Sequence, residues 1–159
     1  MPAASKTING VIIVAHPDDD ALFAGPYQIA NPWISWQIVS VTYSAEHPRG
    51  RELLAWQSQL QCAKTHFLGL PDSRYDIRNG KSSFTPDDVI ARLKPLKLSP
   101  QLILTHSPEG EYGHPHHKVV SEAVTKHYPK VKTLTFAHYS KSCYFSVEVP
   151  DYYERCIAA

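Results

Sequence analysis

The chain contains little cysteine and no cysteine pattern. It has three cysteines in 159 residues, Cys62, Cys143 and Cys156, and they form no CxxC pair and no zinc-finger spacing. An odd number of widely separated cysteines argues against a disulfide framework. We therefore expect free thiols in a reducing compartment.

A strong charge of either sign is also missing, and so is a long apolar run. The formal net charge is +1, from 16 basic and 15 acidic side chains. Such a balance gives no electrostatic reason to bind nucleic acid. No apolar run approaches the roughly 20 residues that span a membrane, and the polar segment 1–9 is unlike a signal peptide. We therefore expect a cytoplasmic protein without a membrane span and without a nucleic-acid partner.

What the chain does contain is a regular alternation of short apolar runs and helical patterns. Its length and its 43% hydrophobic content suit one domain, 1–159, with a sizeable core. We expect strands at 11–15, 36–43, 65–68, 101–105, 131–138 and 144–149, helices at 17–24, 51–64, 86–96 and 115–127, and a loop at 71–86. Gly25 and Pro26 should end the first helix, and Thr85 should cap the third. This order predicts an α/β sandwich around a mainly parallel sheet.

Two of the predicted strands are followed by segments rich in metal-ligand side chains. Segment 15–20 reads AHPDDD after the apolar run 11–14, and segment 113–117 reads GHPHH after the apolar run 102–104. In a parallel α/β sheet, ligands bind beyond the carboxyl ends of the strands. Either segment alone could be a capped or solvated helix end. Because both follow strands of one sheet, we expect them to form one metal site.

The spacing within these segments suggests a ligand set and a base. His16, Asp19 and His117 would supply two imidazoles and one carboxylate, which suits one zinc ion with an open position for water. Asp18 is next to a ligand but should point differently, so it is the candidate general base. His114 could face the leaving group or the oxyanion of a substrate from the opposite side.

The other histidines carry no comparable spacing argument. We expect His116 to be exposed and not to be a ligand. We assign His106 a structural role by default, although it lies in the loop that leads to the second motif.

These motifs resemble those of the PIG-L (LmbE-like) deacetylases. Segment 15–19 (AHPDD) matches the first family motif, and segment 113–117 matches the second, Gly-His-Pro-Asp-His. Weaker similarities lie at 49–52, 68–72 and 105–110, and 149–158 resembles a final helix of the family. The resemblance therefore covers nearly the whole chain.

The resemblance implies a Rossmann-like three-layer fold and a zinc-dependent amide hydrolase that removes N-acyl groups, usually from glucosamine derivatives. By resemblance, His16, Asp19 and His117 are the metal ligands, and Asp18 is the general base. His114 would be the acid or the electrostatic partner.

The resemblance also implies substrate contacts and shows two departures. Tyr112 matches a position whose hydroxyl approaches the oxyanion, while Arg49 and Asp72 match substrate-binding positions. Asp20 replaces the family's usual Glu, and His116 replaces the Asp of the second motif. Neither position is a ligand in the family, so the metal site should survive both changes.

These observations suggest three candidate functions. The leading hypothesis is a zinc-dependent deacetylase of an N-acetylglucosamine-type sugar or its conjugate, with that small molecule as its partner. The alternatives are an amidase for another small N-acyl metabolite, as in natural-product maturation, and a metal- or sugar-binding protein without turnover. An intact Asp18 and His114 argue against the last, because binding alone needs no base. The sequence leaves homo-oligomerisation open.

Overall fold

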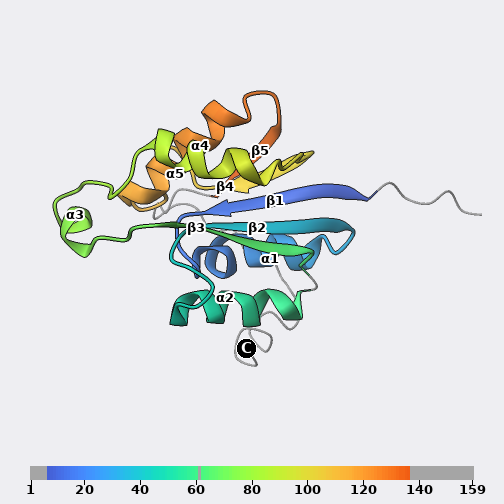
Figure 1. Cartoon of the computed structure of the whole chain (residues 1–159). Coiled ribbons are helices and arrows are strands. Elements are labelled where there is room, and N and C mark those ends of the chain that lie inside the picture. The colour runs from blue at the N-terminus through green and yellow to red at the C-terminus, as the bar shows by residue number, and fades with distance from the viewer. Residues whose placement is uncertain (1–6, 61, 137–159) are drawn as a thin grey trace, which may run out of the picture.

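A parallel sheet of five strands forms the centre of the protein (Figure 1). The computed structural model describes residues 7–60 and 62–136. The strands are β1 (Ile8–Val14), β2 (Ile34–Thr42), β3 (Lys64–Leu70), β4 (Leu102–Thr105) and β5 (Lys132–Thr135), in the spatial order β3-β2-β1-β4-β5. All four neighbouring pairs are parallel. The α/β fold with a parallel sheet is therefore confirmed.

Helices cover both faces of this sheet and complete the three layers. The helices of the described residues are the π-helix η1 (Asp20–Ala24), α1 (Gly25–Ala30), α2 (Pro48–Gln59), α3 (Arg74–Arg78), α4 (Pro86–Leu93), the 3-10 helix η2 (Lys94–Leu96) and α5 (Pro115–His127), and α3 buries no residue. In Figure 1, α4 and α5 lie on one side of the sheet, and α1 and α2 lie on the other. Among the described residues, no helix is both long and apolar enough to cross a membrane.

The central strand β1 shows why two cores form. Successive side chains of a strand point to opposite faces. Val11 and Ile13 belong to the apolar cluster that contains residues of α4 and α5, whereas Ile12 and Val14 belong to the cluster that contains Ala24 of η1 and Leu53 of α2. Each of these four side chains is at most 1% exposed, so the uninterrupted apolar run is explained by burial on both faces.

The strand order places the ends of β1 and β4 at a switch point. The chain proceeds from β1 to β2 and β3 in one direction, and β4 and β5 are added on the other side of β1. Crevices at such points are the usual ligand sites of open α/β sheets. The first histidine motif comes directly after β1, and the second follows β4 after the segment 106–112, so the topology brings both to this crevice.

Several predicted elements are confirmed and others need correction. Helix α5 has the predicted bounds, and α4 begins with the predicted Thr85 cap, which forms a reciprocal capping box with Asp88. Gly25 and Pro26 do not end the first helix, because Pro26 lies in the first turn of α1, where its missing N–H costs nothing. Helix α2 begins earlier and ends earlier than predicted, and α3 interrupts the predicted loop 71–86. The predicted strand 144–149 and the final helix resembling 149–158 lie outside the described residues.

Candidate active site

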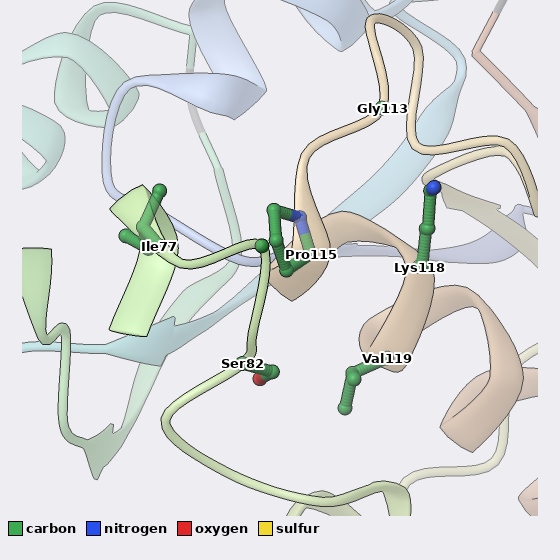
Figure 2. Close-up of a pocket in the computed structure, with 7 residues that line it drawn as sticks. Ile77, Ser82, Gly113, Pro115, Lys118 and Val119 are labelled. Carbon is green, nitrogen blue, oxygen red and sulfur yellow. The ribbon is translucent and has the colours of Figure 1, made fainter. Parts of the chain in front are cut away.

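A pocket of about 510 Å³ opens beside the start of α5 (Figure 2). Its lining residues are Ile77, Gly80, Ser82, Gly113, Pro115, Lys118 and Val119. Gly113 and Pro115 are the two neighbours of His114, so the pocket borders the second histidine motif. The motif itself extends inward, toward the end of β1.

His16 and Asp19 are held together by the turn at the end of β1. The backbone N–H of His16 donates to Asp19 Oδ2 at 2.8 Å, and the Asp19 N–H donates to the carbonyl of His16 at 3.2 Å. His16 Nδ1 lies 3.1 Å from the same Oδ2 atom. Both side chains are buried, at 6% and 3% exposure, and this local geometry confirms that a three-residue spacing makes them converge.

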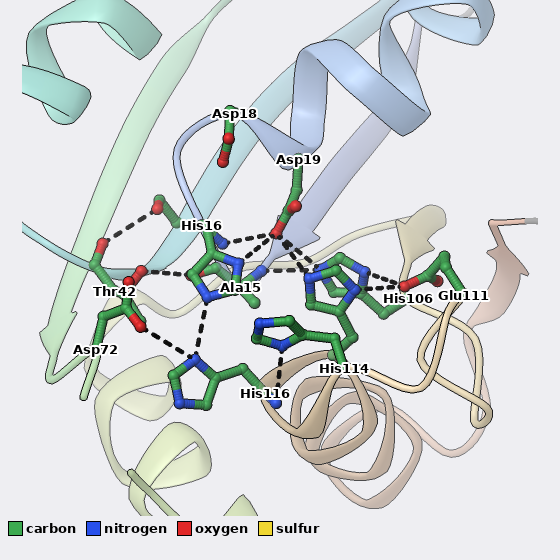
Figure 3. A network of polar contacts seen from close by, with 12 residues as sticks. Ala15, His16, Asp18, Asp19, Thr42, Asp72, His106, Glu111, His114 and His116 are labelled. Carbon is green, nitrogen blue, oxygen red and sulfur yellow. Dashed lines mark hydrogen bonds and ion pairs between the residues drawn. The ribbon is translucent and has the colours of Figure 1, made fainter. Parts of the chain in front are cut away.

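His117 reaches the same carboxylate, that of Asp19 beside His16 in Figure 3, from the first turn of α5. Its Nε2 atom lies 3.3 Å from Asp19 Oδ2. His16, Asp19 and His117 thus offer ligand atoms that all lie within 4.8 Å of one another. Burial raises the pKa of Asp19, but hydrogen bonds from the surrounding histidines outweigh it and keep that pKa well below its usual value. The carboxylate is therefore charged.

Glu111 lies behind His117 and was not singled out by the sequence. It is fully buried, and its carboxylate accepts from His117 Nδ1 at 2.6 Å, His106 Nδ1 at 3.0 Å and the Ser107 N–H at 2.7 Å. These hydrogen bonds outweigh burial and lower the pKa of Glu111 to about 2. Because an ionised carboxylate only accepts, Nδ1 of His117 must carry a proton, and Nε2 is the nitrogen that faces Asp19.

The residues present fit a divalent cation between His16, Asp19 and His117. His117 Nε2 is buried and makes no hydrogen bond within the described part of the chain. Burial lowers the pKa of His117, but the carboxylates of Asp19 and Glu111 raise it to about 9, so the site attracts positive charge. A divalent cation can replace that proton and take up the unpaired nitrogen.

Two other groups of side chains have ligand spacing, but their hydrogen bonds disfavour them. The first is His16, His114 and His116. His114 Nδ1 accepts the backbone N–H of His116, which puts the proton of a neutral His114 on Nε2 and leaves that nitrogen no lone pair.

The second group is His106, Glu111 and His117. The Ala15 N–H donates to His106 Nε2 at 2.9 Å, so His106 carries its proton on Nδ1 and donates it to Glu111. Both imidazole nitrogens that face Glu111 are therefore donors and not ligands. His106 is a structural residue that joins the ends of β1 and β4, which agrees with the default role expected for it.

The predicted base and the predicted substrate residues form a second cluster on the outer side of His16. Asp18 is exposed and pairs with Arg49 at 2.6 Å. Arg49 lies 3.9 Å from Asp72, and Asp72 accepts the hydroxyl of Tyr43 at 2.6 Å. The guanidinium of Arg49 also stacks over the Tyr43 ring at 5.3 Å. The structure thus brings Asp18, Arg49 and Asp72 together, with Tyr43 as an addition.

His114 and Tyr112 border the metal-ligand group from the second motif. The His114 ring stacks on His117 at 4.5 Å, and the Tyr112 ring lies edge-on to His117 at 5.5 Å. Burial and the neighbouring histidines lower the pKa of His114 to about 3, so it is neutral near pH 7. Burial and nearby carboxylates raise the pKa of Tyr112, so its hydroxyl stays protonated. Both residues therefore present hydrogen-bond donors.

A model of the GlcNAc-PI de-N-acetylase (PIG-L) family matches residues 11–128. The chain belongs to this family. It is 25% identical over 126 residues to uncharacterized protein L374 of Acanthamoeba polyphaga mimivirus, a match that covers 70% of this chain and 54% of L374. The chain therefore spans about half the length of this curated relative.

Solved structures share the fold of this PIG-L chain at low sequence identity. Protein TT1542 from Thermus thermophilus is 18% identical with a TM-score of 0.67, over 96% of this chain and 76% of that one. A deacetylase triple mutant of the teicoplanin biosynthetic pathway is 17% identical with a TM-score of 0.68, over 94% and 79%. N,N'-diacetylchitobiose deacetylase from Pyrococcus horikoshii is 14% identical with a TM-score of 0.63, over 94% and 67%.

The two departures from the PIG-L motifs have clear places in the structure. Asp20 is buried and accepts from Gln57 Nε2, which connects it to Gln28 and not to the metal-ligand group. His116 is fully buried, so its predicted exposure was wrong: its side chain points back toward β1 and contacts His16. Sequence reasoning missed this contact and missed Glu111, since a single acid in a loop gives no periodic signal.

Proposed function

We propose that this PIG-L protein is a zinc-dependent deacetylase that removes the N-acetyl group of an N-acetylglucosamine-type sugar or of its conjugate. The observation that carries the proposal is the buried group of His16, Asp19 and His117, in which one imidazole nitrogen has no hydrogen bond within the described residues. Deacetylases of teicoplanin biosynthesis and of N,N'-diacetylchitobiose have the same fold, which supports a sugar-type amide as the substrate.

The ligand group would hold the metal, and Asp18 would handle the proton. When bound there, zinc acts as a Lewis acid that brings the pKa of its water to about 7 and polarises the amide carbonyl. Asp18 adjoins the ligand Asp19 but turns outward to Arg49, so it is free of the ligand group. In our proposal it takes the proton of the attacking water, and the ion pair with Arg49 fixes its direction.

His114 and Tyr112 would act on the opposite side of the amide. The backbone N–H of His116 occupies His114 Nδ1, which leaves Nε2–H as a donor. Because the pKa of His114 is lowered to about 3, the imidazole carries no extra proton near pH 7 and can only donate a hydrogen bond, so we assign His114 the electrostatic role at the oxyanion. The Tyr112 hydroxyl is the second donor in this assignment. Arg49 and Asp72 would bind sugar hydroxyls.

The fold alone does not decide the reaction. 4-Carboxy-2-hydroxymuconate hydratase from Pseudomonas putida also shares it, at 17% identity and a TM-score of 0.58 over 76% of this chain. The reaction is therefore argued from the site. An amidase for another small N-acyl metabolite uses the same residues, whereas a binding protein needs no base at Asp18.

Acetate release from a panel of N-acetylated amino sugars tests the proposal. The zinc-loaded wild type should release acetate from at least one member. Asp18→Asn should keep one zinc ion per chain and lose about 10²–10⁴-fold in kcat, the usual worth of a general base. The matched control is Asp87→Asn, an exposed carboxylate in the first turn of α4.

Three outcomes separate the alternatives. Near-normal turnover by Asp18→Asn would refute the base. Turnover confined to other N-acyl compounds would favour the amidase, and zinc binding without any turnover would favour the binding protein.

A further inference from the structure

Tyr43 has a backbone conformation that is rare for a bulky residue, and it lies outside the segments that resemble family motifs. It directly follows Thr42, the last residue of β2, and its φ angle is 63°. Residues other than glycine seldom adopt this left-handed conformation. Where they do, the surrounding structure holds them there, and such positions gather at active sites and ligand sites. The side chain of Tyr43 is therefore held in a specific direction at a cost in backbone energy.

The end of β2, which directs Tyr43, is fixed on both sides. The N–H and the hydroxyl of Thr42 both donate to the carbonyl oxygen of Ala15, at 2.9 and 2.7 Å. On the other side, Thr42 is the register partner of Leu70, the last residue of β3, after an irregularity in the pairing. An irregularity of this kind can re-aim a side chain beside an active site. Because Tyr43 and Asp72 closely follow these paired residues, both lie at the same rim of the sheet.

The hydroxyl of Tyr43 holds the carboxylate of Asp72. It donates to Asp72 Oδ2 at 2.6 Å, and the side chain of Asp72 is 10% exposed. In Figure 3, Asp72 lies on the side of His16 away from Glu111. Burial and the hydrogen bond to Asp72 raise the pKa of Tyr43, so the phenol keeps its proton and remains the donor. Tyr43 therefore sets the direction of this carboxylate.

The ring of Tyr43 holds the guanidinium of Arg49. The Cζ atom of Arg49 lies over this ring at 5.3 Å from its centre, within the distance of a cation–π contact. The ring of His47, the residue that caps α2, stacks on Tyr43 at 4.3 Å. Arg49 in turn pairs with Asp18 at 2.6 Å. The Tyr43 ring thus connects the end of β2 to the proposed base through the first turn of α2.

We propose that Tyr43 is a positioning residue for the substrate side of the site: its hydroxyl orients Asp72, and its ring orients Arg49. This rests on the proposed function, in which Asp72 and Arg49 bind the sugar and Arg49 directs Asp18. Neither part of the Tyr43 side chain reacts. Because the hydroxyl contacts one partner and the ring contacts the other, two substitutions can tell the two effects apart.

Two variants separate the hydroxyl of Tyr43 from its ring. Tyr43→Phe removes the hydroxyl and keeps the ring over which Arg49 lies. Tyr43→Leu removes both. Kinetics are measured with the zinc-loaded full-length chain and with the N-acetylated amino sugar that wild type hydrolyses best. The matched control is Tyr75→Phe, the same change at a side chain of α3 that is 78% exposed.

The two variants should divide KM from kcat. In Tyr43→Phe, Asp72 is free to turn, which weakens a contact made equally in the ground state and the transition state. We expect KM to rise about tenfold, with kcat within about threefold of wild type. In Tyr43→Leu, Arg49 also loses its support and no longer directs Asp18, so kcat should fall about tenfold in addition. Both variants should keep one zinc ion per chain.

The NMR resonances of the Arg49 side chain test the ring contact without any substrate. Protons over the face of an aromatic ring are shifted upfield by its ring current. The Arg49 side-chain resonances should stay close to their wild-type positions in Tyr43→Phe and should move downfield in Tyr43→Leu. Thermal unfolding shows whether each variant is folded. Tyr43→Gly, in which a positive φ causes no strain, replaces a Leu variant that does not fold.

The outcomes separate this role from the proposed function. Wild-type KM and kcat in both Tyr43 variants, or equal losses in both, overturn the positioning role. Unchanged Arg49 resonances in Tyr43→Leu overturn it as well. If wild type releases no acetate from any sugar, the deacetylase proposal fails, and the Arg49 resonances then decide alone whether Tyr43 positions this arginine.

Discussion

Each histidine of the site has two ring nitrogens. The hydrogen bond made by one of them decides whether the other has a lone pair for a metal. Seven residues of the described chain fall into three groups of ligand spacing: His16, Asp19, His106, Glu111, His114, His116 and His117. Distance alone does not separate these groups. Hydrogen bonds do, because a backbone N–H that donates to one nitrogen of a neutral imidazole places the proton on the other. This leaves His16, Asp19 and His117 as the best ligand group.

Glu111 should be as necessary for the metal as a ligand is. It accepts hydrogen bonds from His117, His106 and Ser107. In Glu111→Gln, one acceptor oxygen becomes an NH₂ group. This donor then faces another buried N–H donor, and the hydrogen bond between them is lost. We expect zinc affinity to fall about 10–100-fold and the free energy of unfolding to fall by roughly 1–3 kcal/mol. Chelator competition and urea denaturation measure the two effects.

Glu109→Gln is the matched control for this change. Glu109 is exposed in the same loop, so its substitution should leave both quantities nearly unchanged. Wild-type zinc affinity in Glu111→Gln would show that the orientation of His117 does not depend on this carboxylate.

For individual residues, the sequence predicts contacts between side chains that are close in the sequence or that follow the ends of neighbouring strands. The convergence of His16 with Asp19 follows from their spacing, and the arrival of His117 follows from the parallel order of β1 and β4. The burial of His116 could not be predicted, because it depends on Ser83 and Phe84, which approach only after α4 packs against α5. Glu111 could not be predicted for a similar reason, since its donors come from the segment after β4 and from α5.

At the scale of elements, turns after the strands place the functional side chains. The chain after β1 turns through Asp18 and Asp19 into the π-helix η1. π-Helical turns occur often at functional sites because they displace side chains from regular helical positions. Here the turn sends Asp19 inward to the histidines and Asp18 outward to Arg49. The AHPDD segment can therefore separate the proposed ligand from the proposed base although the two residues are adjacent.

Helix α2 depends on a close approach at Gly50, next to Arg49. A Cβ atom at Gly50 would lie 2.0 Å from the carbonyl oxygen of Ser44. Because this neighbour is backbone, Gly50→Ala should shift the start of α2 and destabilise the protein by roughly 2 kcal/mol, within the range for a strained buried site. The shift should also move Arg49 away from Asp18. Urea denaturation measures the stability.

Glu52→Ala serves as the comparison within α2. Glu52 is exposed in the same helix, and its substitution should change stability by less than about 0.5 kcal/mol. A Gly50→Ala protein as stable as this control would mean that the start of α2 adapts without strain.

Element prediction succeeds where local chemistry and tertiary packing agree. The Thr85 capping box and the Pro115–His127 helix have strong local signals, and the structure has both. Gly25 and Pro26 have a strong local signal for a helix end, but the burial of Ala24, Gly25 and Gln28 favours a continued helix against the sheet. The local signal was therefore overruled by packing.

At the scale of the whole molecule, the strand order creates one crevice, and the second histidine motif lies between this crevice and the pocket on the surface. The metal-ligand group lies at the ends of β1 and β4, and the pocket of about 510 Å³ lies on the outer side of Gly113 and Pro115 (Figure 2). A substrate whose amide reaches His114 could extend its remaining part into this pocket. The single-domain assignment 1–159 and the cytoplasmic location stay predictions, and homo-oligomerisation stays open.

The lining of this pocket predicts only a modest preference for the group attached to the sugar. Its seven residues include no aromatic ring, and Lys118 is the charged side chain among them. Stacking on aromatic rings supplies much of the energy that holds an extended sugar, and binding energy from remote parts of a substrate raises kcat/KM only where contacts exist. We expect kcat/KM for free N-acetylglucosamine to lie within about tenfold, or roughly 1.4 kcal/mol, of that for larger N-acetylglucosaminides.

The comparison uses the monosaccharide, a disaccharide and a phospho- or lipid-linked form, each with wild type and with Lys118→Met. Because Lys118 is the charged residue of the pocket, its loss should lower kcat/KM for the phospho-linked form and leave the monosaccharide unchanged. A preference of several orders of magnitude for one large conjugate would contradict the prediction and would mean that residues beyond those described complete the site. Such a result would also mean that the pocket binds a specific group of that conjugate, because only contacts made in the transition state can produce so large a ratio of kcat/KM values.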